Sequence, residues 1–85
     1  MKRLELKENN GWFEAVVNLK DEIAMIQIEG DTIINLLISV DGDDWVNHTS
    51  NIVINGIDII NLVNGKFMMY LKIQSQNNVE INLLN

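Results

Sequence analysis

The sequence predicts an all-β fold, a small antiparallel meander of about eight or nine strands that forms a sandwich or barrel. Apolar and polar residues alternate over most of the chain, which is the period of a strand with one buried face. Turn-forming pairs that contain Gly, Asn or Asp recur roughly every 8 to 12 residues. The chain contains no proline, so every residue of these runs keeps the backbone amide that sheet pairing requires. We expect residues 1–85 to form a single all-β domain.

Two segments of the chain, 26–36 and 52–62, resemble each other. Each holds an alternating apolar run, a glycine and a second apolar run, a pattern typical of a β-hairpin. The sequence therefore predicts two related hairpin units with further strands around them. The identical residues are Ile26 and Ile52, Ile28 and Ile54, Gly30 and Gly56, Ile33 and Ile59, Ile34 and Ile60, Asn35 and Asn61, and Leu36 and Leu62.

The N-terminal part predicts strands at 3–7, 12–20 and 22–29. A turn at 8–11 separates the first two, because Asn and Gly tolerate positive φ. Alternation gives each strand one face toward the core and one face toward solvent. The expected core residues of the second and third strands are Phe13, Ala15, Val17, Leu19, Ala24, Ile26 and Ile28.

The segment 32–40 is apolar on both faces, since Ile33 and Leu37 lie opposite the core positions. A strand of this kind is covered on both sides, by another layer or by a second subunit. Asp41-Gly42 predicts a hairpin turn after it. The next residues, 46–50, are the least patterned and are expected to form an edge or a loop.

The C-terminal part predicts strands at 50–54, 66–74 and 79–83. The segment 57–63 fits a strand or a short helix capped by Asp58, and its match to the first unit favours a strand. The last strand is expected to leave an open edge available for pairing with another chain.

The charge of the chain is unevenly distributed. The formal net charge is -6 at pH 7 and the sequence pI is about 4.4, which disfavours nucleic acid and anionic membranes as partners. The span 21–65 contains no Lys or Arg. Its carboxylates are Asp21, Glu22, Glu29, Asp31, Asp41, Asp43, Asp44 and Asp58.

Two acidic turns are expected at one end of the sheet, because alternate turns of a meander lie together. They are candidates for a docking surface that receives a basic partner. Solvated turns that keep an apolar chain in solution are the main alternative. A calcium site is disfavoured, since Trp45 occupies the third ligand position of the twelve-residue calcium loop. The residues concerned are Asp21, Glu22, Asp41, Asp43 and Asp44.

A second group of residues predicts self-association. Tryptophans at strand ends and apolar residues on the second face of a strand are typical of interfaces. Capping of the open end of the core is the alternative for the tryptophans. The predicted interface residues are Ile33, Leu37, Met68, Tyr70, Trp12 and Trp45.

No catalytic motif is present. Ser50, His48 and Asp44 are close in sequence, but closeness in sequence does not create the geometry of a triad. Isolated glycines form no phosphate loop, and the absence of cysteine excludes thiolate metal sites and disulfides. We therefore expect no enzyme activity, no metal and no cofactor.

These observations predict a non-catalytic binding protein that acts as a homo-oligomeric assembly or interaction module. One alternative is a small acidic inhibitor or immunity-type protein, of phage or bacterial origin, that blocks a basic nucleic-acid-binding surface of a target. Another is an oligomeric binder of a small ligand. The charged residues 1–7 do not resemble a signal peptide and no apolar run could span a bilayer, so a cytoplasmic location is expected.

Overall fold

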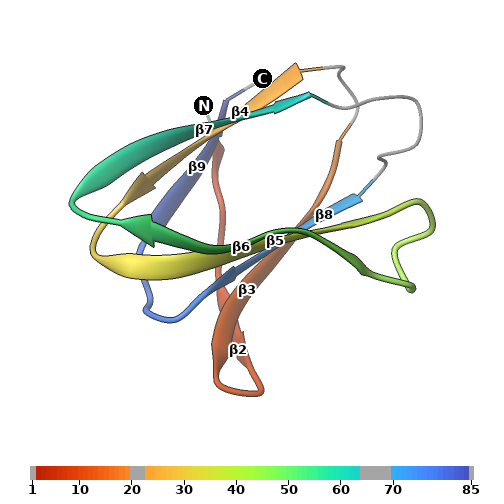
Figure 1. Cartoon of the computed structure of the whole chain (residues 1–85), viewed down its shortest axis with the longest axis horizontal. Helices are drawn as coiled ribbons and strands as arrows, with labels where there is room; N and C mark the ends of the chain where they lie inside the picture. The colour runs from red at the N-terminus through yellow and green to blue at the C-terminus, as the bar shows by residue number, and fades with distance from the viewer. Residues whose placement is uncertain (1, 20–22, 64–69, 85) are drawn as a thin grey trace.

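Two antiparallel sheets pack face to face in the computed structural model, which describes residues 2–19, 23–63 and 70–84 (Figure 1). One sheet has the strand order β1-β9-β4-β7 and the other has the order β2-β3-β8-β5-β6. The strands are β1 (Lys2–Arg3), β2 (Lys7–Asn9), β3 (Trp12–Asn18), β4 (Ile23–Glu29), β5 (Thr32–Ser39), β6 (Val46–Ile54), β7 (Ile57–Val63), β8 (Tyr70–Ser75) and β9 (Glu80–Leu84).

The predicted all-β fold is confirmed, and the segment 57–63 is a strand. The connectivity differs from a simple meander. Consecutive strands pair in the hairpins β2–β3 and β5–β6, whereas the other connections carry the chain from one sheet to the other. The prediction of an open last strand was wrong, because β9 lies between β1 and β4. Local alternation predicts which side of a strand is buried, but it does not fix which strand lies beside it.

The two repeated units are arches that cross between the sheets, so their prediction as hairpins was wrong. A hairpin and an arch share the pattern of two alternating runs around a glycine, and only packing of the inner faces distinguishes them. Ile28 precedes the first crossing and Ile34 follows it, and both are fully buried on opposite sheets.

The two arches are related by an approximate two-fold axis. β4 of the first arch pairs with β7 of the second, and β5 pairs with β6. Ile26 pairs with Ile60 in one sheet, and the equivalent residues Ile52 and Ile34 pair in the other. The crossing turns also contact each other, since the Gly30 amide donates to the Gly56 carbonyl at 2.6 Å. The sequence repeat therefore corresponds to a structural repeat.

The core lies between the inner faces of both sheets. Each fully buried Ile or Leu contributes about 1.5–3 kcal/mol relative to an exposed one. The described apolar side chains with almost no exposed surface are Ile26, Ile28 and Ile81 from the four-stranded sheet and Ile34, Leu36, Ile54, Leu71 and Ile73 from the five-stranded sheet.

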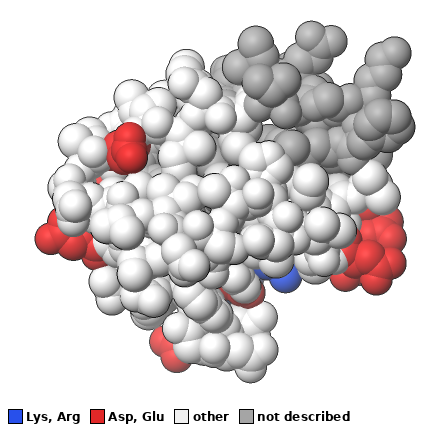
Figure 2. Space-filling model, viewed as in Figure 1, with Lys and Arg blue, Asp and Glu red and all other residues white. Residues whose placement is uncertain are grey.

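Charged side chains lie mainly at the margins of the face in Figure 2, whose centre is largely uncharged. A red patch marks the right-hand end, where Figure 1 places the β5–β6 loop. The residues that the structure describes contain no helix with the length and hydropathy of a membrane span.

Candidate functional site

The outer face of the five-stranded sheet gathers most of the predicted interface residues. Ala15 and Val17 of β3, like Leu71 and Ile73 of β8, point into the core, so the residues between them face outward. Met68 lies outside the described residues. We call this surface the aromatic face; its residues are Trp12, Glu14, Val16, Ile33, Asn35, Leu37, Tyr70, Lys72 and Gln74, with Trp45 from the β5–β6 loop.

Both tryptophans and the only tyrosine of the chain belong to the aromatic face. Trp12, Trp45 and Tyr70 are half-buried, so part of each ring system remains accessible. Amphipathic aromatic side chains in this state are characteristic of binding surfaces, because the ring provides apolar area and the polar atom provides a hydrogen bond.

A band of polar side chains crosses the middle of the aromatic face. Glu14, Gln74 and Asn35 are neighbours across β3, β8 and β5. The Glu14 carboxylate accepts hydrogen bonds from the side-chain amides of Asn9 at 2.9 Å and Gln74 at 2.5 Å. The Asn35 oxygen accepts the Asn51 amide at 2.9 Å. These bonds fix the polar groups before any partner arrives.

The β5–β6 loop is organised by the carboxylate of Asp41. One oxygen, Oδ1, accepts the amides of Asp43 and Asp44 at 2.9 and 3.0 Å and the Ser39 hydroxyl at 2.9 Å. These bonds stabilise the ionised carboxylate and lower the pKa of Asp41 from 3.8 to about 2, the Asp44 amide having the largest effect. The Ser39 hydroxyl also accepts the Gly42 amide at 2.8 Å.

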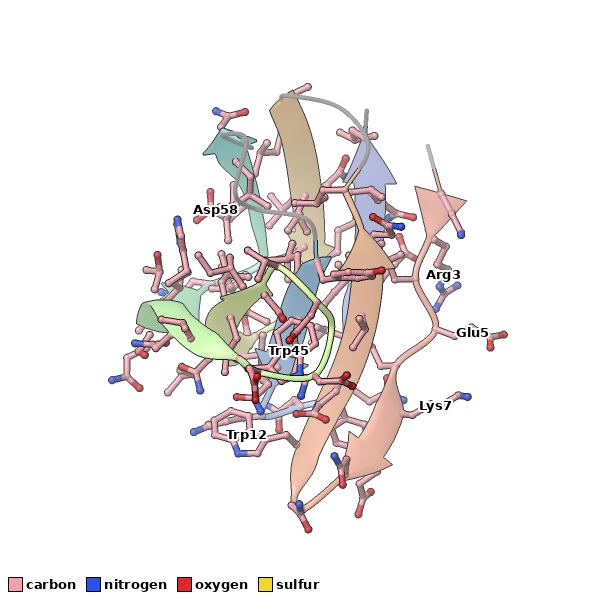
Figure 3. The ribbon with its side chains drawn as sticks, turned by 90° about the vertical axis from the view of Figure 1, so that its right-hand side faces the viewer. Arg3, Glu5, Lys7, Trp12, Trp45 and Asp58 are labelled. Atoms are coloured by element: carbon pink, nitrogen blue, oxygen red, sulfur yellow. The ribbon has the colours of Figure 1, made fainter. Side chains whose placement is uncertain are left out.

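The same loop lies against the aromatic face. A Cβ atom added at Gly42 would lie 3.6 Å from the Tyr70 ring, in ordinary van der Waals contact, so the loop passes close to that ring. The Lys72 ammonium lies 4.5 Å from the centroid of the Trp45 ring, within the range of a cation–π interaction. Figure 3 shows Trp45 in this loop and Trp12 at the end of β3. The loop therefore adds Trp45 to the sheet surface.

The predicted acidic end is only partly described, because Asp21 and Glu22 lie outside the described residues. Asp41, Asp43 and Asp44 are exposed in the β5–β6 loop. No group of three or more His, Cys, Asp or Glu side chains with the arrangement of a metal site occurs within 2–19, 23–63 and 70–84.

His48 and Ser50 lie on the exposed strand β6, and each contacts another neighbour. His48 Nδ1 lies 2.9 Å from the Thr49 hydroxyl, and the Ser50 hydroxyl donates to Asn47 Oδ1 at 2.8 Å. Neither of these two bonds involves Asp44.

The polar band and Lys72 were not predicted as site residues. Alternation places Glu14, Asn35, Lys72 and Gln74 on outer faces, which is a signal available in the sequence. Their grouping depends on β8 inserting between β3 and β5, which local sequence does not specify.

Comparison with protein families, curated proteins and solved structures found no match.

Proposed function

We propose that this chain is a non-catalytic binding protein that assembles with copies of itself through the aromatic face. The observation that supports this most strongly is the concentration of both tryptophans and the tyrosine, all half-buried, on one outer sheet face. The outer face of the other sheet is polar over much of β4 and β9, where side chains form hydrogen bonds and an ion pair with one another. Its recorded contacts are Gln27 with Glu29, Asn82 with Glu80, and Arg3 with Glu80.

The pattern of the aromatic face suits a second copy as its partner. Trp12 and Ile33 lie on one side of the polar band, and Leu37, Trp45 and Tyr70 lie on the other. A two-fold axis through the band places apolar groups on apolar groups and amides on amides, as an isologous interface requires. Side-chain amides can pair with each other because each has donors and an acceptor.

The charges of the aromatic face also favour a second copy. Glu14 and Lys72 oppose each other in sign, although the chain as a whole carries a net charge of -6. Two copies therefore meet less repulsion at this face than at a face rich in carboxylates.

The proposal is tested by measuring the native mass of the protein by light scattering over a range of concentrations. We expect an oligomer, and we expect Leu37→Glu to weaken it by at least about tenfold, or about 1.4 kcal/mol, because the interface would bury an unpaired charge. Ile59→Glu is the matched control, since Ile59 is 52% exposed on the outer face of the other sheet.

A monomer at every concentration would overturn the proposal. It would then favour the second prediction, capture of a basic protein surface by the exposed β5–β6 loop. That prediction has less support, because Asp41 Oδ1 is occupied by the loop itself. An oligomer that both variants leave intact would also contradict assembly through the aromatic face.

A further inference from the structure

The N-terminal segment covers only the first half of β3. β2 pairs only with Trp12–Glu14. The residues before β2 belong to the other sheet, where the Leu4 amide donates to the Ile81 carbonyl at 2.8 Å. Among the described residues, no strand pairs with 15–18 on that side of β3. The second half of β3 is therefore an open sheet edge.

A groove of about 880 Å³ lies between this open edge and the crossing segment. Its lining includes Ala15, Val16 and Val17 of β3 on one side and Leu4 and Glu5 on the other. Figure 3 views this side of the molecule, with Arg3, Glu5 and Lys7 projecting outward from the N-terminal segment. The volume is in the range of pockets that hold organic ligands or short peptides.

The turn between β2 and β3 determines which backbone groups of β3 face its open edge. Asn10 and Gly11 both have positive φ, 53° and 84°, as in a type I′ hairpin turn. In such a turn the Trp12 amide donates back across the hairpin, toward β2. Backbone direction alternates along a strand, so the amides and carbonyls of Val16 and Asn18 also point to this side. They are directed toward the open edge, where no described strand pairs with them.

The charged side chains of the groove are balanced. Three basic and three acidic residues line it, and two of these already have partners. Arg3 forms an ion pair with Glu80 at 3.5 Å, and Glu14 accepts the amides of Asn9 and Gln74. The lining residues are Lys2, Arg3, Lys7, Glu5, Glu8 and Glu14. On a chain with a net charge of -6, this balance favours an uncharged partner.

We propose that the groove binds an extended, uncharged peptide segment of another protein, which pairs as an added strand with Val16 and Asn18. The segment continues the line of β2 along β3, and main-chain hydrogen bonds provide its affinity. Alternate side chains of the segment face inward, toward Leu4 and the inner side of β3, and are expected to be apolar. This binding uses the backbone edge of β3, whereas assembly uses the outer side chains of the aromatic face; Val16 belongs to both surfaces.

The probe for this proposal is a capped hexapeptide of alternating valine and threonine, added to the isotope-labelled full chain and followed by amide hydrogen exchange. Without peptide, the Val16 and Asn18 amides should exchange faster than the amide of Val17, which faces β8. Saturating peptide should slow exchange at Val16 and Asn18 by about tenfold or more, since each amide gains a hydrogen bond. The same peptide methylated on every backbone nitrogen should have no effect, because it cannot donate to the Val16 and Asn18 carbonyls and its methyl groups keep it from approaching the strand closely.

A second measurement replaces Val16 with proline, which removes the amide donor and should abolish peptide binding. If that variant fails to fold, the methylated peptide still provides the control. Unchanged exchange at Val16 and Asn18, equal binding of the methylated peptide, or protection confined to another edge strand such as β7 would overturn the proposal.

Discussion

At the scale of single residues, Asp41 shows how one carboxylate can organise a loop. Its pKa is lowered to about 2, so the folded protein resists protonating it. The stability that the ionised form provides is complete above pH 3.8, the unperturbed value, and is lost as the pH falls toward about 2. The two loop amides and the Ser39 hydroxyl are the groups that lose their ionised partner.

We expect Asp41→Asn to lower the midpoint of chemical unfolding at neutral pH, because an amide oxygen accepts these hydrogen bonds more weakly than a carboxylate. The difference from the unmodified protein should shrink between pH 3.8 and about 2. Asp43→Asn is the control, since it removes the same charge from the next acidic residue of the loop. Equal losses of stability in both variants would show that charge alone, and not the hydrogen bonds of Asp41, is responsible.

At the scale of elements, the two crossing turns are equivalent in sequence but differ in packing. Gly30 has a φ of 129° and Gly56 a φ of 85°, values that favour glycine at both positions. A Cβ atom at Gly30 would lie 2.7 Å from Cγ1 of Val79, whereas a Cβ atom at Gly56 would meet nothing within 4 Å. The β8–β9 connection, which holds Val79, therefore fills the space beside Gly30, whereas the corresponding space beside Gly56 is open.

The pair Gly30→Ala and Gly56→Ala tests this difference. Backbone strain should cost about 1–2 kcal/mol in each variant. Gly30→Ala should lose roughly 1–3 kcal/mol more, because β-branched Val79 cannot move its methyl group freely. Denaturant titration measures both losses. Adding Val79→Ala to Gly30→Ala should reduce the extra loss of stability. Equal losses in the single variants Gly30→Ala and Gly56→Ala would show that Val79 does not restrict the space beside Gly30.

At the scale of the whole molecule, the open sheet edges decide where other chains can attach. β1 and β2 are short and rich in charge. β6 is interrupted by register shifts near Leu36 and by a positive φ at Asn51. These are features that discourage edge pairing. β7 is a seven-residue edge with Ile57 and Ile59 exposed, and it has one charged residue, Asp58.

Asp58 protects this edge in two ways. It pairs in register with the fully buried Ile28 but is itself exposed, so its charge lies at the solvent-facing rim of the edge strand. Its carboxylate also accepts the Ile59 amide at 2.8 Å, a donor that an added strand would otherwise use. A charged side chain on an edge strand is a recognised defence against edge-to-edge association.

We therefore expect Asp58→Val to produce larger species that grow with concentration, measured by light scattering. Asp43→Val is the matched control, because it removes the same charge from a loop that belongs to no sheet edge. Identical masses for both variants and the unmodified protein would show that Asp58 does not protect the edge.

Local sequence predicted most of the strands and their buried faces. It missed that the expected strand 3–7 is divided between β1 and β2 in different sheets, and that 46–50 belongs to β6. Alternation identified Ile26, Ile28, Ala15 and Val17 as core residues, because a strand that buries one face must repeat every second residue. It also predicted the turn at Asn10 and Gly11, whose φ values require residues that tolerate them. The repeat of 26–36 at 52–62 indicated two related units.

Only the tertiary structure decided how these strands are arranged. The position of β9 inside its sheet, the arches at Gly30 and Gly56, and the polar band at Glu14 all depend on pairings between distant segments. A buried hydroxyl pair, Thr32 and Ser75 at 2.8 Å, likewise joins residues far apart in the chain. The sequence determined the composition of the inner and outer faces, because the period of a strand is local. The strand order determined which outer residues become neighbours, and the strand order itself depends on how all the buried faces pack together.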